Sequence, residues 1–199
     1  MNFHDFFERF GIKFGMVDKS CVNIDTFLFE KERKQLKALQ HPNRKIEFIG
    51  VRQLRNEMIK NQEISYSDSG KPYLKDSKMH ISISHSDAAI CLCLSQNSVG
   101  IDIEIPSLRS VKVASKFCSD AESKLFNTSS IDDMTTLWSI KESIYKKIDE
   151  PGLDFKKCIR VLERGISKSM CVVKSNLTNI EVLIGHEKID NQFLNFTIE

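Results

Sequence analysis

The segment Ser98–Ile105, SVGIDIEI, constrains the fold of this chain more than any other part of it. Its aliphatic side chains occupy every second position and alternate with Gly100, Asp102 and Glu104. A period of two predicts a β-strand with the aliphatic residues on one face and both carboxylates on the other. The glycine on the polar face permits the close approach of another backbone.

Helical spacing of apolar residues predicts three long helices. Two of them, over Glu30–Gln40 and Asn43–Lys60, are separated by the sequence HPN, in which Asn43 can cap the second helix. The third helix is expected over Asp132–Lys147 and stops before Pro151.

Strands and helices are interleaved along the whole chain, which predicts the α+β class. Ser119 and Glu122 form a capping-box pattern that opens a short helix. The polar segment around Asn97 is the expected seam between two halves, residues 1–96 and 97–199. Further strands are predicted from apolar runs at Met79–Ser84, Ala88–Leu94, Cys158–Glu163, Met170–Lys174 and Glu181–Ile184.

Charge and composition narrow the class of protein. The chain has 29 basic and 27 acidic residues, a net charge of +2, which argues against a nucleic-acid-binding protein. Its six cysteines form no CxxC pair, and its start has no signal-peptide pattern. No apolar run approaches the ~20 residues that cross a bilayer. A cytoplasmic location without membrane attachment is therefore expected.

The two carboxylates of the predicted strand are candidate metal ligands. Taken alone, Asp102 and Glu104 have about even odds of being solvated acids, but a convergent pair of this kind suits Mg²⁺. Glu142, on the predicted long helix, is a candidate third ligand. Lys141 and Lys146 beside it can serve phosphates, although Glu142 and Lys146 also fit an ordinary surface pair.

A second candidate group lies in the first half, in the sequences GKP and ISISHS. Lys71, Ser84 and His85 can form a cradle for a phosphate. A histidine at the end of a strand is also commonly a structural residue, and this alternative stays open.

The order GKP, SISHS, VGIDIE and WSIKESIYKK resembles the surfactin-synthetase-activating type of 4′-phosphopantetheinyl transferase. The resemblance runs from Arg44 to Phe155. It implies two α+β halves related by a pseudo-twofold axis, with coenzyme A bound in the cleft between them. Many relatives have a glycine soon after the helix lysine, where this chain has Lys147–Glu150.

By motif position, the resemblance also implies roles for individual residues. Asp102, Glu104 and Glu142 would hold Mg²⁺, and Lys141 and Lys146 would contact phosphates, with Lys146 at the departing one. The 3′-phosphate of coenzyme A would be held by Lys71, Ser84 and His85. Basic residues directed towards the nucleotide are expected at Arg44 and Arg52.

The reaction implied is attack by a serine hydroxyl of an apo acyl or peptidyl carrier protein on coenzyme A, with release of 3′,5′-ADP. The serine proton would pass to Glu142 or to a metal-bound water, and the sequence does not choose between them. Two alternatives are a Mg²⁺-dependent phosphohydrolase and a degenerate module that binds coenzyme A or carrier protein. The expected enzyme is a cytoplasmic monomer that serves fatty-acid, polyketide or peptide-synthetase carriers.

Overall fold

The structure, a computed structural model, describes residues 4–198 and separates into two compact units between Asn97 and Ser98. We call them the N-terminal unit and the C-terminal unit and describe each by itself. Among the described residues, no helix is both long enough and apolar enough to cross a membrane.

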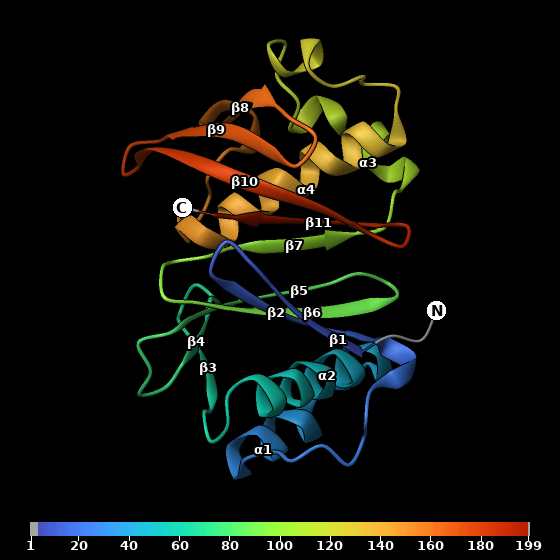
Figure 1. Ribbon diagram of the computed structural model, residues 1–199, viewed down its shortest axis with the longest axis vertical. Coiled ribbons are helices and arrows are strands. Elements are labelled where there is room, and N and C mark those ends of the chain that lie inside the picture. The colour runs from blue at the N-terminus through green and yellow to red at the C-terminus, as the bar shows by residue number, and fades with distance from the viewer. Residues whose placement is uncertain (1–3, 199) are drawn as a thin grey trace. The chain divides into compact units, whose positions relative to one another are not determined.

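The N-terminal unit is an antiparallel sheet with a long helix packed on one face (Figure 1). The strands run in the order β1-β2-β6-β5, and the helix α2 contacts β2 and β6. Two short strands, β3 and β4, pair separately, and β4 lies beside β5. The elements are β1 (His4–Arg9), β2 (Ile12–Asp18), α1 (Glu30–Ala38), α2 (Pro42–Met58), β3 (Ile64–Tyr66), β4 (Pro72–Leu74), β5 (His80–His85) and β6 (Ala89–Ser95), with a 3₁₀ turn at Lys19–Cys21.

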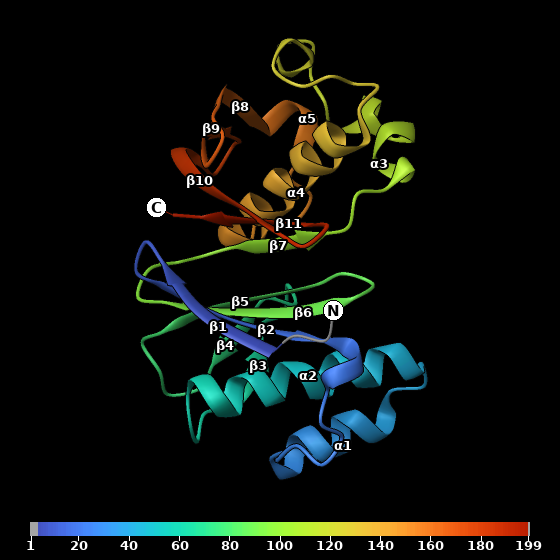
Figure 2. The same cartoon turned by 45° about the vertical axis from the view of Figure 1, so that its right-hand side comes forward.

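The C-terminal unit is a larger antiparallel sheet, in the order β7-β11-β10-β9-β8. Its long helix α4 packs across β7 and β11, as Figure 2 shows. The elements are β7 (Ile101–Glu104), α3 (Leu108–Lys112), α4 (Ile131–Ile148), α5 (Phe155–Cys158), β8 (Ile159–Arg164), β9 (Lys168–Lys174), β10 (Asn179–Ile189) and β11 (Gln192–Thr197), with 3₁₀ turns at Ala114–Lys116 and Glu122–Lys124.

Helix α4 follows from its local sequence. Ser130 caps its first turn by accepting a hydrogen bond from the backbone NH of Asp133. Its apolar stripe is fully buried and includes Leu137 and Ile140. The helix ends at Ile148, and its C-cap residue Asp149 has φ 59° and ψ 41°. An aspartate thus takes the left-handed conformation at the end of this helix.

Strand β7 and helix α4 approach each other at Gly100, as its position in the sequence predicted. A Cβ atom on Gly100 would lie 1.9 Å from the carbonyl oxygen of Ser143. Any side chain at this position would therefore push the carboxylate strand away from the helix that carries Glu142.

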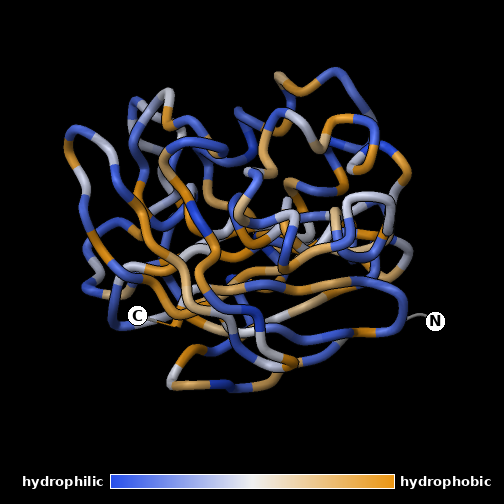
Figure 3. The backbone as a smooth tube through the Cα atoms, turned by 90° about the horizontal axis from the view of Figure 1, so that it is seen from above, coloured by the Kyte–Doolittle hydropathy of each residue, from blue (hydrophilic) through white to orange (hydrophobic). Residues whose placement is uncertain are grey.

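The α+β class and the three long helices are confirmed, and Figure 3 shows apolar stretches of backbone alternating with hydrophilic loops. The predicted capping box is also present, because Ser119 and Glu122 each accept a hydrogen bond from the backbone NH of the other. The prediction that Asn43 caps the second helix is wrong. His41 is the cap residue and Pro42 occupies the first turn, where the missing NH of a proline costs nothing. Five strands, β1, β2, β3, β4 and β11, were not predicted.

Candidate active site

The C-terminal unit brings three acidic residues together, and we call Asp102, Glu104 and Glu142 the carboxylate cluster. Asp102 and Glu104 are two residues apart on β7 and so share one face of the sheet. Helix α4 lies on this face, since Ser139 donates a hydrogen bond to the backbone carbonyl of Asp102 over 3.3 Å. Glu142 is on the same helix, one turn further along.

Two carboxylates of the cluster have raised pKa values. Burial raises the pKa of Glu104 to about 7, and the charge of Asp102 adds to this rise. Burial likewise raises the pKa of Glu142, again with a contribution from Asp102. The indole of Trp138 hydrogen-bonds to Glu104 and opposes its shift. Glu104 and Glu142 therefore lie in surroundings that disfavour their ionised forms, through burial first and like charge second.

Lys146 places a positive charge beside the carboxylate cluster and opposes the rise in the pKa of Glu104 and Glu142. Its Nζ atom lies 2.7 Å from Oδ1 of Asp102 and 2.9 Å from the backbone carbonyl oxygen of Ile101. The side chain of Lys146 is 28% exposed, whereas that of Asp102 is 6% exposed. Lys146 can therefore reach both the carboxylate cluster and a ligand arriving from solvent.

Lys141 has a different role from the one predicted. It is fully buried, and its Nζ donates hydrogen bonds to Glu122 and to the carbonyl oxygens of Phe117, Phe155 and Ile159. An ammonium group with all its donors occupied inside the core presents none to a phosphate. The prediction of a phosphate contact is corrected, because the capping-box carboxylate of Glu122 binds this lysine.

The carboxylate cluster has the donor chemistry of a site for a hard cation. Mg²⁺ binds oxygen ligands, takes one or two carboxylates and keeps positions for phosphate oxygens. Burial and the charge of Asp102 raise the pKa values of Glu104 and Glu142, and a divalent ion would favour their ionised forms. Within residues 4–198, however, no three acidic, histidine or cysteine side chains already stand in a metal-binding arrangement. The residues fit the ion chemically, and their side chains would have to turn to enclose it.

A second charged group lies in the N-terminal unit around Glu47 of α2, and we call it the Glu47 cluster. Oε1 of Glu47 is 2.8 Å from Nζ of Lys19 and 3.4 Å from Nδ1 of His85. Its Oε2 is 3.0 Å from the guanidinium of Arg44, which also lies 3.2 Å from Nε2 of His85.

Burial alone would raise the pKa of Glu47, but the hydrogen bond from Lys19 and the charges of His85, Lys19 and Arg44 outweigh it and hold the pKa below its usual value. Two cations and a histidine around one carboxylate leave this surface positive, which suits an anion. The structure thus unites Arg44 and His85 as candidates. The sequence analysis missed Lys19 and Glu47. Spacing of three residues from Arg44 could have identified Glu47, whereas Lys19 reaches it from 28 residues away.

Lys71 and Ser84 belong to the same unit. Lys71 directly precedes β4, and its backbone NH and carbonyl bond to Ser67 and close the turn from β3. Ser84 precedes His85 on β5 and is 5% exposed, so little of its surface can meet a ligand.

Arg52 is a core residue in this structure. It is 1% exposed, pairs with the buried carboxylate of Glu32 over 3.3 Å, and stacks 3.5 Å above the centre of the Phe48 ring. Glu32 is itself fully buried and requires a cationic partner. The prediction that Arg52 contacts the nucleotide is corrected for this reason.

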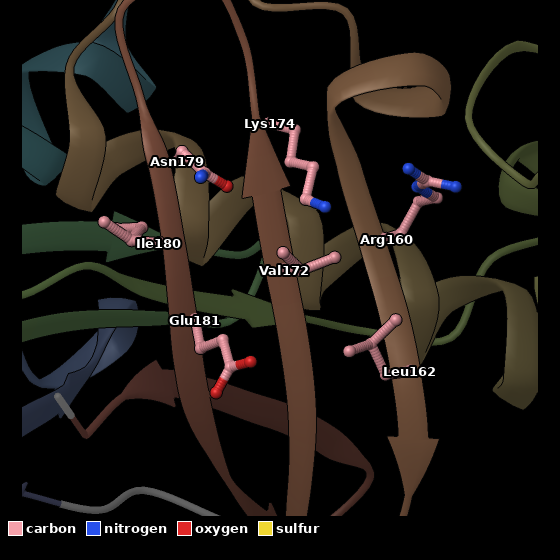
Figure 4. A pocket seen from close by; sticks show the side chains of 7 residues that line it. All are labelled: Arg160, Leu162, Val172, Lys174, Asn179, Ile180 and Glu181. Atoms are coloured by element: carbon pink, nitrogen blue, oxygen red, sulfur yellow. The ribbon is translucent and has the colours of Figure 1, made fainter.

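A shallow hollow of about 610 Å³ lies elsewhere, on the face of β8, β9 and β10 turned away from α4 (Figure 4). Its residues alternate along the strands with core residues such as Val161 and Val173. None of the predicted site residues borders it. The lining side chains are Arg160, Leu162, Val172, Lys174, Asn179, Ile180 and Glu181.

The C-terminal unit is similar in sequence to known proteins. Residues 98–190, which include the carboxylate cluster and Lys146, match the model of the 4′-phosphopantetheinyl transferase superfamily. The chain is also 38% identical over 97 residues to the 4′-phosphopantetheinyl transferase gsp of Aneurinibacillus migulanus. That alignment covers 45% of this chain and 40% of the relative, so the chain spans less than half the length of the protein it matches. Residues 98–190 of this chain are thus similar to the 4′-phosphopantetheinyl transferase superfamily.

Proposed function

We propose that this protein transfers the 4′-phosphopantetheine group of coenzyme A to a serine of an apo acyl or peptidyl carrier protein, in a Mg²⁺-dependent reaction that releases 3′,5′-ADP. The observation that carries the proposal is the packing of the carboxylate cluster with Lys146 inside the segment that matches the superfamily. Clustered carboxylates and a partly exposed lysine are the groups that phosphoryl transfer requires for positioning and charge neutralisation.

The carboxylate cluster and Lys146 have separate roles in the proposed reaction. Asp102, Glu104 and Glu142 would hold Mg²⁺, which supplies charge neutralisation on the pyrophosphate. As the serine oxygen bonds to the β-phosphorus, the bond from that phosphorus to the bridging oxygen breaks and its electrons remain on 3′,5′-ADP. The proton of the serine would pass to a base, for which Glu142 is the candidate among the residues of the cluster. Lys146 stabilises the charge on the departing phosphate.

The Glu47 cluster supports a nucleotide-binding role for the N-terminal unit. Lys19, Arg44 and His85 offer cationic donors for the 3′-phosphate of coenzyme A, with Lys71 and Ser84 on neighbouring elements of the unit. Glu47 holds the cluster together in the absence of the anion, because it neutralises part of the charge between the basic groups.

The remaining parts of the proposal concern architecture and setting. Each unit packs one long helix on an antiparallel sheet, which supports the expected pseudo-twofold relationship between them. We propose that the protein works as a monomer in the cytoplasm, without nucleic acid or membrane as partners. Its six free thiols and its net charge of +2 support this setting.

Release of 3′,5′-ADP tests the reaction class. The protein is incubated with coenzyme A and Mg²⁺, with or without an apo carrier protein, and the nucleotide product is measured by chromatography. We expect 3′,5′-ADP only in the presence of the carrier. Release without a carrier would identify a phosphohydrolase, and coenzyme A binding without any release would identify a catalytically inactive module.

A further inference from the structure

Three polar residues form a row across adjacent strands of the C-terminal sheet. His186 of β10 lies opposite Asn195 of β11, and Asn195 lies opposite Asp102 of β7. Residues directly opposite each other on neighbouring strands point to the same face of a sheet. Asn195 and His186 therefore share the face on which Asp102 meets Lys146.

A hydrogen-bonded chain fixes the side chain of Asn195. Nδ1 of His186 is 2.5 Å from Oδ1 of Asn195, and Nε2 of His186 is 2.7 Å from Oγ of Ser169. A carbonyl oxygen only accepts hydrogen bonds, so Nδ1 carries the proton and Nε2 accepts from Ser169. Burial lowers the pKa of His186, which agrees with a neutral ring.

The NH₂ group of the same amide is buried without a hydrogen bond to any described residue. Asn195 is 1% exposed, and within the described chain its Nδ2 atom has no hydrogen-bond partner. Leaving a buried donor unsatisfied costs about 1–3 kcal/mol and is uncommon in folded proteins. Oδ1 and Nδ2 project from Cγ in different directions. Because Oδ1 is directed to β10, the NH₂ group is directed towards β7. Its neighbour there is Asp102.

We propose that Asn195 is a positioning residue for Asp102, an inference that rests on the proposed function. In the present state Lys146 holds Oδ1 of Asp102. When Lys146 turns to a substrate phosphate, Nδ2 of Asn195 donates a hydrogen bond to the Asp102 carboxylate and keeps it oriented for its ligand. His186 and Ser169 act one step further away, since they hold the amide in the orientation that directs its NH₂ group to β7.

Binding of Mn²⁺ in the presence of coenzyme A tests this role without depending on group transfer. Asn195→Leu keeps the number of side-chain heavy atoms but removes the whole amide, both the NH₂ donor and the oxygen that faces His186. Loss of a group that orients a metal ligand typically costs 10–100-fold in metal affinity, and we expect a Kd for Mn²⁺ weakened by about this factor in Asn195→Leu. Electron paramagnetic resonance of free Mn²⁺, measured on the full chain, gives this constant.

Thr197→Val is the matched control. Thr197 is on the same strand and face, is 1% exposed, and accepts a hydrogen bond from the backbone NH of Gly100. Its loss should lower stability and leave Mn²⁺ affinity within about twofold of wild type. Equal weakening by Asn195→Leu and Thr197→Val would overturn the proposal, because a general loss of packing would then explain both.

His186→Leu provides a second route that leaves β11 intact. We expect it to weaken Mn²⁺ binding in the same direction, and to have no additional effect when combined with Asn195→Leu. Additive effects would overturn the proposal. An unchanged Mn²⁺ affinity in folded His186→Leu would also overturn it, even if Asn195→Leu fails to fold. A wild-type protein that binds no Mn²⁺ would overturn it as well. A wild type that binds Mn²⁺ but modifies no carrier protein would defeat only the proposed function.

Discussion

Nζ of Lys146 lies 2.7 Å from Oδ1 of Asp102, and this ion pair joins the long helix of the C-terminal unit to the carboxylate strand. One lysine shared with three carboxylates leaves an excess of negative charge. Under the proposed function, Lys146 would turn from this pair to a substrate phosphate while a cation would take its place at Asp102.

Replacement of Asp102 should separate activity from stability. Asp102→Asn keeps the volume of the side chain but removes a charge that repels Glu104 and Glu142. We expect most carrier modification to be lost, while the free energy of unfolding changes by less than about 1 kcal/mol. Denaturant unfolding and a transfer assay on the same preparation measure the two quantities. A large loss of stability would instead make Asp102 a structural residue.

The two lysines of α4 should behave in opposite ways. Lys141→Met leaves Glu122 buried without its cation, so it should cost about 3–5 kcal/mol of stability. Lys146→Met changes a partly exposed pair and should cost less than about 1 kcal/mol, but it should lower kcat more than it raises KM for coenzyme A. A Lys146 variant with an altered KM alone would limit this residue to binding the ground state.

Stability should depend on pH through Glu104. Its pKa of about 7 in the folded protein exceeds the ordinary value of 4.5, so the folded state binds this proton more tightly. The resulting stabilisation is fully present below 4.5 and is lost as the pH rises through 7. In metal-free buffer, the unfolding free energy of wild type relative to Glu104→Gln should therefore fall between about pH 5 and pH 8.

Subtraction of the Glu104→Gln curve matters because His186 acts in the opposite direction. Burial lowers the pKa of His186, so its contribution is lost as the pH falls below 6.5. Both proteins share this effect, and it cancels in the difference. Parallel curves for wild type and Glu104→Gln would show that Glu104 does not titrate in this range.

The 3′-phosphate of coenzyme A should be recognised through the N-terminal unit. Loss of two charge-assisted contacts at about 1.5 kcal/mol each predicts roughly a hundredfold lower kcat/KM for 3′-dephospho-coenzyme A. The double variant Lys71→Ala, His85→Ala should erase most of this preference. Lys75→Ala, which changes an exposed lysine next to β4, is the control and should keep it. If the folded double variant still prefers coenzyme A over its 3′-dephospho form as strongly as wild type does, the assignment to Lys71 and His85 is wrong. Lys19 and Arg44 would then be the candidates for the phosphate site.

Local patterns in the sequence predicted the elements that build the site. The alternation around Asp102 predicted strand β7, and helical spacing predicted α4 with Glu142 on it. These signals were sufficient because period and capping act within a few residues. Strand β11 was missed, although it forms the register that places Asn195 beside Asp102. Its apolar residues, in the sequence QFLNFT, do not show strict alternation.

The predicted phosphate and nucleotide contacts of two basic residues were wrong because each side chain pairs with a buried acid. Lys141 and Arg52 both lie in stretches that suggest phosphate contacts, yet each is bound by a fully buried carboxylate, Glu122 and Glu32 respectively. The partner of Lys141 is 19 residues away and that of Arg52 is 20 residues away. Such pairings depend on tertiary packing, which no local pattern in the sequence reports.

Intact-mass spectrometry of apo carrier proteins tests the central claim most directly. A panel of fatty-acid, polyketide and peptide-synthetase carriers is incubated with the protein, coenzyme A and Mg²⁺. The proposed function predicts that at least one carrier gains the mass of one phosphopantetheine group, and that EDTA or the Asp102→Asn substitution abolishes the gain. A panel that stays unmodified, with the protein folded and Mg²⁺ present, would contradict it.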